Sequence, residues 1–137
     1  HWSGQKAFLA VEGGLESGLM IVQYVSAACV AELHHLANPA STTNISVSME
    51  KEDHVSMGAT ACHRLLTCCE MLSRVIANEF IAAIGCLRNI SETPGVGVSS
   101  IFSTINGMIP TLDHDQSLSE VSDGLALELR FGLLHDL

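Results

Sequence analysis

Apolar residues recur along the chain at intervals of three and four, which is the spacing of one face of an α-helix. The first such region runs from Leu15 to Ala37, and much of the rest of that region is also apolar. A helix with apolar residues on most of its faces is expected to be buried on most sides. Asn38-Pro39 ends it, because proline has no N–H to donate and restricts the residue before it.

A longer region with the same spacing predicts a second helix, from about Asp53 or His54 to Arg88. A helix of about 35 residues is longer than most helices of globular proteins, and this length favours a large helical bundle. The apolar stripe of this helix consists of Leu65, Cys69, Leu72, Ile76, Phe80, Ile84 and Leu87.

The remaining segments alternate between predicted turns and shorter helices. Ala40–Lys51 is rich in Ser, Thr and Asn and is expected to be a loop with little regular structure. After a break at Ser91–Gly95, a short helix is predicted at about Val98–Met108. Pro110–Asp115 forms a further turn, and the last helix covers about Leu118–Leu134. No strand pattern is present, so we predict an all-α chain with one long helix.

The composition describes a chain with little polar surface. Hydrophobic residues make up 47% and charged residues 15%, against roughly 25% charged residues in ordinary soluble domains. We expect so apolar a chain to be surrounded by other protein, as a subunit or as part of a larger chain. The longest apolar stretch, Gly18–Leu33, contains polar residues and is shorter than the about 20 residues of a membrane span. A buried helix is therefore expected, and no membrane insertion.

Net charge and cysteine content narrow the function classes further. The formal net charge is −9, which disfavours nucleic-acid binding, because that class needs a basic surface. The five cysteines are odd in number and match no disulfide framework, and no signal peptide is visible. We expect reduced, mostly buried thiols and a cytoplasmic location. The histidines and cysteines lack metal-ligand spacing, so no metal site is predicted.

The strongest candidate for chemistry is Glu52, at the predicted junction of the polar loop and the long helix. Functional residues concentrate in loops that rigid elements hold. A carboxylate there can accept a charge-assisted hydrogen bond from an imidazole N–H or an ammonium group, and it can move a proton if burial raises its pKa. The structural alternative is that Glu50, Glu52 and Asp53 are acids favoured by the dipole at a helix N-terminus, with Asp53 as the helix cap.

Two stretches carry a resemblance to a known family. Residues 12–23 read EGGLESGLMIVQ, and NPAS at residues 38–41 is followed by EDHVSMG at residues 52–58. Both resemble the aromatic amino-acid ammonia-lyases, and within that family the histidine-specific members. IPTLDHD at residues 109–115, with the helix after it, is similar to the family's C-terminus. The resemblance covers nearly all of residues 1–137 and only the last quarter of a typical member, so it implies one segment: the C-terminal portion of a large helical bundle with one long central helix.

The resemblance implies an enzyme that eliminates ammonia from an amino acid; histidine gives urocanate and ammonia. Family members use an electrophile, a methylidene-imidazolone, that forms by cyclisation of an internal Ala-Ser-Gly triad. They are helical tetramers whose active sites collect residues from several subunits. This sequence contains no Ala-Ser-Gly. We therefore expect the chain alone to be inactive, and we expect a partner, either a larger lyase chain or an upstream segment, to carry the triad.

The resemblance also assigns residues to the site. Glu52 is the predicted catalytic residue, and Met20 and Glu52 are the predicted substrate-binding residues. Phenylalanine-specific members tend to have lysine at the position of Met20 and glutamine at that of Glu52, so this pair favours histidine. Taken without the resemblance, Met20 is interpreted as a core residue, since methionine fills irregular gaps. The sequence departs from the histidine-specific pattern at Lys51, which could pair with Glu52, and in the loop Thr42–Met49.

Two other functions stay open at this point. The chain could be a non-catalytic assembly or regulatory subunit that keeps the helical fold without the chemistry. It could also belong to a lyase or aminomutase that acts on phenylalanine or tyrosine. Replacing Glu52 with Ala separates the first from a catalytic role, and substrate profiling separates the second.

Overall fold

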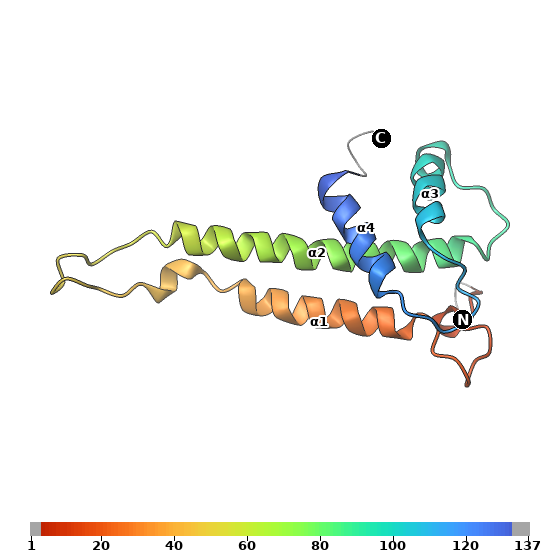
Figure 1. Ribbon diagram of the computed structural model, residues 1–137, viewed down its shortest axis with the longest axis horizontal. Helices are drawn as coiled ribbons and strands as arrows, with labels where there is room; N and C mark the ends of the chain where they lie inside the picture. The colour runs from red at the N-terminus through yellow and green to blue at the C-terminus, as the bar shows by residue number, and fades with distance from the viewer. Residues whose placement is uncertain (1–3, 133–137) are drawn as a thin grey trace.

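The computed structural model describes residues 4–132, in which a long hairpin of two antiparallel helices carries two shorter helices at one end (Figure 1). Residues 4–132 contain no β-strand, so the all-α prediction is confirmed for them. None of the helices in this range is long and apolar enough to cross a lipid bilayer. The elements in chain order are η1 (Ala7–Leu9), α1 (Met20–Leu36), η2 (Ala40–Thr43), α2 (Gly58–Leu87), α3 (Val96–Met108) and α4 (Ser119–Phe131).

The first arm of the hairpin, α1, begins at Met20 rather than at the predicted Leu15. A helix beginning at Leu15 would use the amide of Leu19 to bond the Leu15 carbonyl. That amide donates instead to the Phe8 carbonyl oxygen at 2.7 Å, so the chain turns here and the helix starts one residue later. At the other end α1 stops at Leu36, close to the predicted end.

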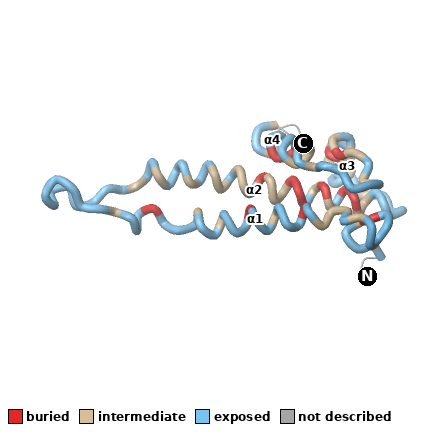
Figure 2. The backbone as a smooth tube through the Cα atoms, turned by 60° about the horizontal axis from the view of Figure 1, so that its bottom comes forward, coloured by how far each residue is buried: buried red, intermediate tan, exposed pale blue. Residues whose placement is uncertain are grey.

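α1 is covered on one side only. Val22 and Cys29 are buried against the rest of the chain, whereas Ile21 and Tyr24 are 58% and 62% exposed. Figure 2 shows most of α1 exposed, with its contacts along the side that faces α2. Residues 4–132 alone do not bury α1 on most sides, because the apolar faces away from α2 have no covering element there. Its burial by other protein stays a prediction.

The second arm, α2, begins at Gly58 and not at Asp53 or His54. The loop before it is held in a non-helical course by Asn44, whose side chain accepts from the Val55 amide at 3.2 Å and donates to the Val55 carbonyl oxygen. α2 then continues for 30 residues and ends at Leu87. It is the long central helix that the apolar stripe predicts, shortened at its start by this loop contact.

The loop between the two arms has more structure than its composition predicts. Ala40–Thr43 forms the short helix η2, and the backbones of Val47 and Glu52 exchange two hydrogen bonds of 2.9 and 3.3 Å. Ser48, Met49 and Glu50, at the tip between them, have left-handed backbone angles with φ of 54°, 55° and 65°. This tip lies at the far end of the hairpin from α3 and α4 (Figure 1).

The core lies where α3 and α4 pack on the C-terminal half of α2. Ile81 of α2, Ile105 of α3 and Leu125 of α4 are fully buried there. Figure 2 shows the buried residues gathered at this end of the molecule. α3 begins at Val96 rather than Val98, and α4 begins at Ser119, one residue after the predicted start. The predicted end of the last helix, Leu134, lies outside the described residues.

The apolar stripe of α2 is covered along only part of its length. Ile84 is buried in the core and Phe80 packs against it, whereas Leu65 and Leu72 are 62% and 50% exposed. Cys69, on the same stripe, is also exposed. The expectation of mostly buried thiols is wrong for the same reason: all five cysteines are free, Cys29 alone is buried, Cys68 and Cys86 are half-buried, and Cys62 and Cys69 are exposed.

A buried amide joins three of the helices. Asn78 of α2 is 3% exposed. It donates to the hydroxyl of Ser26 in α1 at 3.0 Å and accepts from the hydroxyl of Ser122 in α4 at 2.8 Å. A buried polar side chain without partners destabilises a fold, and these two bonds satisfy Asn78. They also fix how α1 and α4 lie on α2.

Arg88, immediately after α2, holds the end of α3. Its guanidinium donates to the Asn106 side chain at 2.7 Å and to the carbonyl oxygens of Asn106, Ile109 and Pro110 at 2.9, 2.7 and 2.6 Å. The last carbonyls of a helix have no partner within the helix. The planar guanidinium has five N–H donors and can bond several of these carbonyl oxygens at once. Arg88 thereby fixes the position of the segment that follows α3.

Candidate active site

Met20 is half-buried at the first position of α1, at the end of the hairpin where α3 and α4 lie. Its amide donates to the carbonyl oxygen of Ser17 at 3.1 Å. The N-cap residue, Leu19, supplies no side-chain cap, and the first turn of α1 contains no acidic residue. The direction in which Met20 leaves the preceding turn therefore depends on what holds residues 17–19 from outside the helix.

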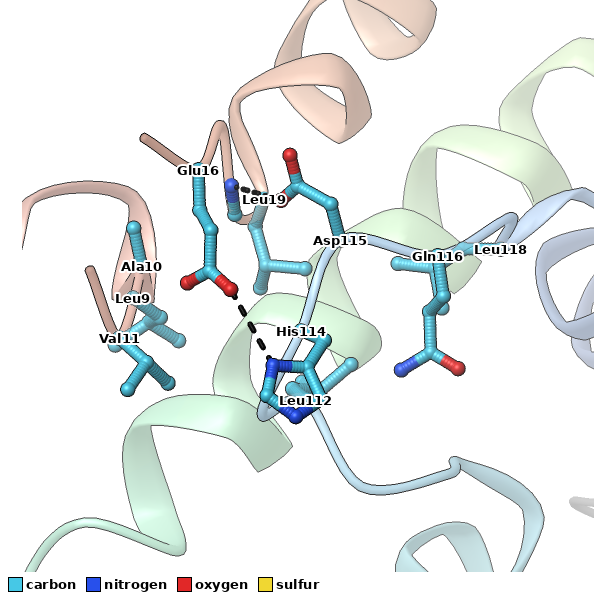
Figure 3. A pocket seen from close by; sticks show the side chains of 11 residues that line it. Leu9, Ala10, Val11, Glu16, Leu19, Leu112, His114, Asp115, Gln116 and Leu118 are labelled. Carbon is cyan, nitrogen blue, oxygen red and sulfur yellow. Dashed lines mark hydrogen bonds and ion pairs between the residues drawn. The ribbon is translucent and has the colours of Figure 1, made fainter. Parts of the chain in front are cut away.

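Asp115, in the connection from α3 to α4, holds this turn. Its two carboxylate oxygens accept from the Ser17 amide at 3.1 and 2.9 Å, and one of them also accepts from the Gly18 amide at 2.8 Å. Figure 3 shows Asp115 beside the turn from Glu16 to Leu19. Gly18 has φ of +52°, and a Cβ atom there would overlap the Phe8 carbonyl oxygen. The close packing of this turn therefore requires glycine.

A second carboxylate, that of Glu16, lies near Asp115, and both residues line one small pocket. Glu16 accepts from the Glu12 amide at 3.0 Å and lies 3.4 Å from Nδ1 of His114 (Figure 3). The Glu12 amide holds the pKa of Glu16 below its ordinary value of 4.5, and His114 adds to this lowering. Hydrogen bonds to the ionised form have this effect because they stabilise the charge. Glu16 and Asp115 together join the segment before α1 to the segment before α4.

The contacts of Glu16 and Asp115 are absent from the sequence predictions. Residues 12–23 and 109–115 stand out as two separate motif stretches, yet residues 97 and 98 positions apart are in contact where these stretches meet. No rule of local sequence spacing connects residues so far apart, so the contacts of Asp115 and Glu16 are revealed only by the fold. Neither here nor elsewhere in residues 4–132 do three or more His, Cys, Asp or Glu side chains form a group that could hold a metal ion.

Glu52 lies at the opposite end of the hairpin, exposed in the loop before α2. Its backbone pairs with Val47. Because α2 begins only at Gly58 and its first turn holds no acid, Glu50, Glu52 and Asp53 are not residues of a helix N-terminus. Asp53 is not the cap either: Met57 occupies that position, with no side-chain cap bond.

The proposed pairing of Lys51 with Glu52 is likewise not found. The ion pairs of residues 4–132 join Arg74 to Glu70 and Asp123, and His114 to Glu16. The carboxylate of Glu52 therefore carries no ion-pair partner from this part of the chain, and it is open to a group brought by another molecule or by another polypeptide.

One chain does not bring Met20 and Glu52 together. α1 has 17 residues, which at 1.5 Å per residue is about 25 Å, and Met20 begins it whereas Glu52 follows it at the far loop (Figure 1). The two predicted substrate-binding residues therefore belong to two separate locations of this chain. The end with Met20 is packed and hydrogen-bonded, and the end with Glu52 is exposed.

Comparison with known proteins identifies the class. Residues 1–106 match the family model described as aromatic amino acid lyase. This match covers more than half of the chain and includes both Met20 and Glu52. The chain therefore belongs to the aromatic amino acid lyase family, and its all-helical hairpin is the part of the fold described above.

The individual relatives are histidine ammonia-lyases. That of Gloeobacter violaceus is 40% identical over 118 residues, which are 85% of this chain and 23% of the relative. That of Streptomyces coelicolor is 52% identical over 80 residues, 58% of this chain and 16% of the relative. The crystal structure of histidine ammonia-lyase from Trypanosoma cruzi superposes with a TM-score of 0.86 at 31% identity, covering 93% of this chain and 25% of that one. The chain thus spans about a quarter of the length of the relatives it matches.

Proposed function

We propose that this chain contributes active-site residues to a histidine ammonia-lyase, the enzyme that converts histidine to urocanate and ammonia. The observation that carries the proposal is the similarity to histidine ammonia-lyases at 40–52% identity. The resemblance of the motifs around Met20 and Glu52 to those of histidine-specific members supports it. The relatives' activity belongs to chains about four times as long, so the share of this chain is inferred from its own residues.

The electrophile is proposed to come from another chain or from an upstream segment. The methylidene-imidazolone of the family is built from an Ala-Ser-Gly triad, and this sequence contains none. The residues present here therefore do not fit the formation of that group. What is left to this chain is to bind the substrate, orient it and exchange protons with it.

Glu52 is proposed to bind the polar part of the substrate. Histidine carries an imidazole N–H and an ammonium group, and a carboxylate accepts a charge-assisted hydrogen bond from either. If a neighbouring polypeptide covers the loop, the loss of water strengthens this interaction and makes proton transfer by Glu52 feasible. The exposure of Glu52 within this chain is consistent with such a covering partner.

Met20 is proposed to line the pocket for the substrate ring. Its thioether side chain is flexible and polarisable, and such side chains pack well against aromatic rings. It lies on a helix whose start is fixed by contacts from distant segments. A lysine at this position would place a positive charge near the ring, which disfavours a substrate ring that can itself be protonated.

A substrate that contacts both residues must lie between two copies of the chain. Within one copy the whole of α1, about 25 Å, lies between Met20 and the loop that carries Glu52. We therefore propose that the Met20 end of one copy meets the Glu52 end of another, in a tetramer-type assembly. The exposed apolar side chains on both arms, such as Tyr24 and Leu65 at 62% each, supply surface for such packing.

The test is Glu52→Gln in the assembled protein. The change removes the charge and the proton-accepting ability with little change in shape, and loss of a general base typically lowers turnover about 10²- to 10⁴-fold. The matched control is Glu50→Gln, two residues earlier in the same exposed loop, and it is expected to leave turnover unchanged. Native mass spectrometry checks that both variants assemble alike.

Two results would redirect the proposal. Unchanged histidine turnover in Glu52→Gln would remove Glu52 from catalysis and leave the non-catalytic assembly role. Turnover of phenylalanine or tyrosine in preference to histidine by the unsubstituted protein would replace the substrate. Denatured masses of the components test the electrophile separately, since the chain that carries it is expected to be lighter than its sequence by two water molecules.

A further inference from the structure

The turn before α1 is held by a residue almost a hundred positions away. Asp115 accepts from the backbone amides of Ser17 and Gly18 at 2.8 to 3.1 Å. These two amides come immediately before the N-cap of α1, and Met20 is the first residue of that helix. Any movement of the turn therefore moves the base of the Met20 side chain.

We propose that Asp115 is a positioning residue for Met20: it sets the direction in which the Met20 side chain enters the substrate pocket. The inference rests on the proposed function, because it gives Asp115 a role in recognising the substrate ring through Met20. It adds a residue from the connection between α3 and α4 to a site otherwise made from the two ends of the hairpin.

The start of α1 lacks a side-chain cap. The first amides of an α-helix lack partners within the helix, and a side chain at the N-cap usually supplies one. In α1 the N-cap is Leu19, which has no such group, and no acid occurs in the first turn. Asp115 acts from outside the helix instead: its oxygens accept the amides of Ser17 and Gly18, the two residues before the N-cap, and its negative charge lies near the positive end of the helix dipole.

The surrounding packing makes the turn sensitive to the loss of this carboxylate. The Leu19 amide donates to the Phe8 carbonyl oxygen at 2.7 Å, and Gly18 lies so close to Phe8 and Ala10 that a Cβ atom would clash with their backbone. The turn is thus pressed against residues 8–10 on one side and held by Asp115 on the other. With Asp115 removed, the amides of Ser17 and Gly18 lose their side-chain acceptor, and the turn is held less firmly.

An aspartate suits position 115 better than asparagine, alanine or glutamate does. Both of its oxygens reach the Ser17 amide, and one also reaches the Gly18 amide. Asparagine keeps one acceptor oxygen and loses the charge. Alanine loses both, and glutamate keeps the charge on a longer arm. The three substitutions therefore grade the contact from partial to complete loss.

The experiment measures kcat and KM for histidine in the assembled lyase with Asp115→Ala, Asp115→Asn and Asp115→Glu. Because a lost hydrogen bond to a charged group typically corresponds to a tenfold effect or more, we expect Asp115→Ala to raise KM about tenfold while kcat changes less than about twofold. Asp115→Asn is expected to be intermediate. Asp113→Asn is the matched control, an exposed carboxylate in the same connection, and should leave KM unchanged.

A double-mutant cycle with Met20→Leu tests whether Asp115 acts through Met20. Met20→Leu should itself raise KM, and adding Asp115→Ala to it should cost far less than the single substitution does, because two residues that act through one contact are not additive. Hydrogen exchange of the Ser17 and Gly18 amides should speed up in Asp115→Ala and not in Asp113→Asn, which shows that the turn itself has loosened.

The outcomes are distinct. Additive effects in the cycle would overturn the positioning role and leave the proposed function intact. The same would follow if the Asp113→Asn control changed kcat and KM as much as Asp115→Ala does. A neutral Met20→Leu would overturn it together with the assignment of Met20 to the substrate pocket. If Asp115→Ala does not assemble, the Asp115→Asn variant decides: an unchanged KM with slower or unchanged amide exchange would overturn the proposal.

Discussion

Met20 begins α1, and Glu52 follows the other end of that helix in the exposed loop, so the whole length of α1 separates the two side chains. This relationship gives a prediction about active sites shared between chains. If one site takes Met20 from one copy and Glu52 from another, mixing a Met20→Lys chain with a Glu52→Gln chain regenerates some sites in which both residues are intact.

We therefore expect that each variant alone has low histidine turnover and that a co-refolded or co-expressed mixture recovers a substantial fraction of the unsubstituted activity. The check is an activity assay on the mixture beside each separate variant. A chain carrying both substitutions, mixed with either single variant, is the control and should not recover activity. No recovery in the first mixture would mean that Met20 and Glu52 do not share a site.

Arg88 predicts a loss of stability at the α2–α3 end. Its guanidinium makes four hydrogen bonds to the end of α3. Lysine keeps the charge but has no planar fork, so Arg88→Lys should lower the free energy of unfolding by about 2 kcal/mol. The measurement is the urea midpoint. Arg64→Lys, where a single bond to the Asn38 carbonyl oxygen is at stake, should shift the midpoint much less.

Asn78 predicts a loss of stability where α1, α2 and α4 meet. Asn78→Ala removes a hydrogen-bond partner from both Ser26 and Ser122, whose hydroxyl groups stay half-buried. The expected decrease in unfolding free energy is about 2–3 kcal/mol, since lost partners cost the desolvation of the groups left behind. Glu79→Ala, the exposed neighbour, should be close to neutral. Equal midpoints for the two variants would contradict the role of Asn78.

Glu16 predicts a pH dependence of the segment before α1. The Glu12 amide, and after it His114, hold the pKa of Glu16 below 4.5. A carboxyl group whose pKa is lowered in the folded state stabilises that state above its unfolded pKa, and this contribution is lost as the pH falls through the lowered value. Exchange of the Glu12 amide should therefore stay slow from neutral pH down to about 4.5 and speed up below it, beyond the intrinsic change.

The same measurement on Glu16→Gln should show no such step, because glutamine does not titrate. His114→Gln should move the step a little upward in pH, since it removes the smaller of the two stabilising contacts. A step of the same size and midpoint in Glu16→Gln would assign the titration to another group.

The helices could be predicted from the sequence, and the starts of the two long ones, α1 and α2, could not. The apolar spacing around Leu72 and Ile84 indicates α2 because a helical face has only local requirements. The starts at Met20 and Gly58 depend on partners from elsewhere: the Phe8 carbonyl oxygen takes the Leu19 amide, and Asn44 takes the backbone of Val55. Helix propensity is overridden where a more distant group captures an amide that the first turn would use.

For the candidate site, residue types could be predicted and positions in space could not. Met20 and Glu52 were recognised from motifs, and their roles stay predictions. The motif spacing carries no information on whether they meet, and the hairpin shows that within one chain they do not. The contacts of Asp115 were missed because a carboxylate in a turn between helices has many ordinary uses, and its partners are backbone amides with no residue-specific signature.

The exposed half of the α2 stripe has a thermodynamic consequence. Leu65 and Leu72 show their apolar faces to solvent, so a polypeptide that covers them binds the folded chain and not the unfolded one. By mass action, every tenfold rise in the concentration of such a partner above its dissociation constant adds about 1.4 kcal/mol to the apparent stability of the chain. The melting temperature of this protein would then be a property of its concentration and stoichiometry as much as of its sequence.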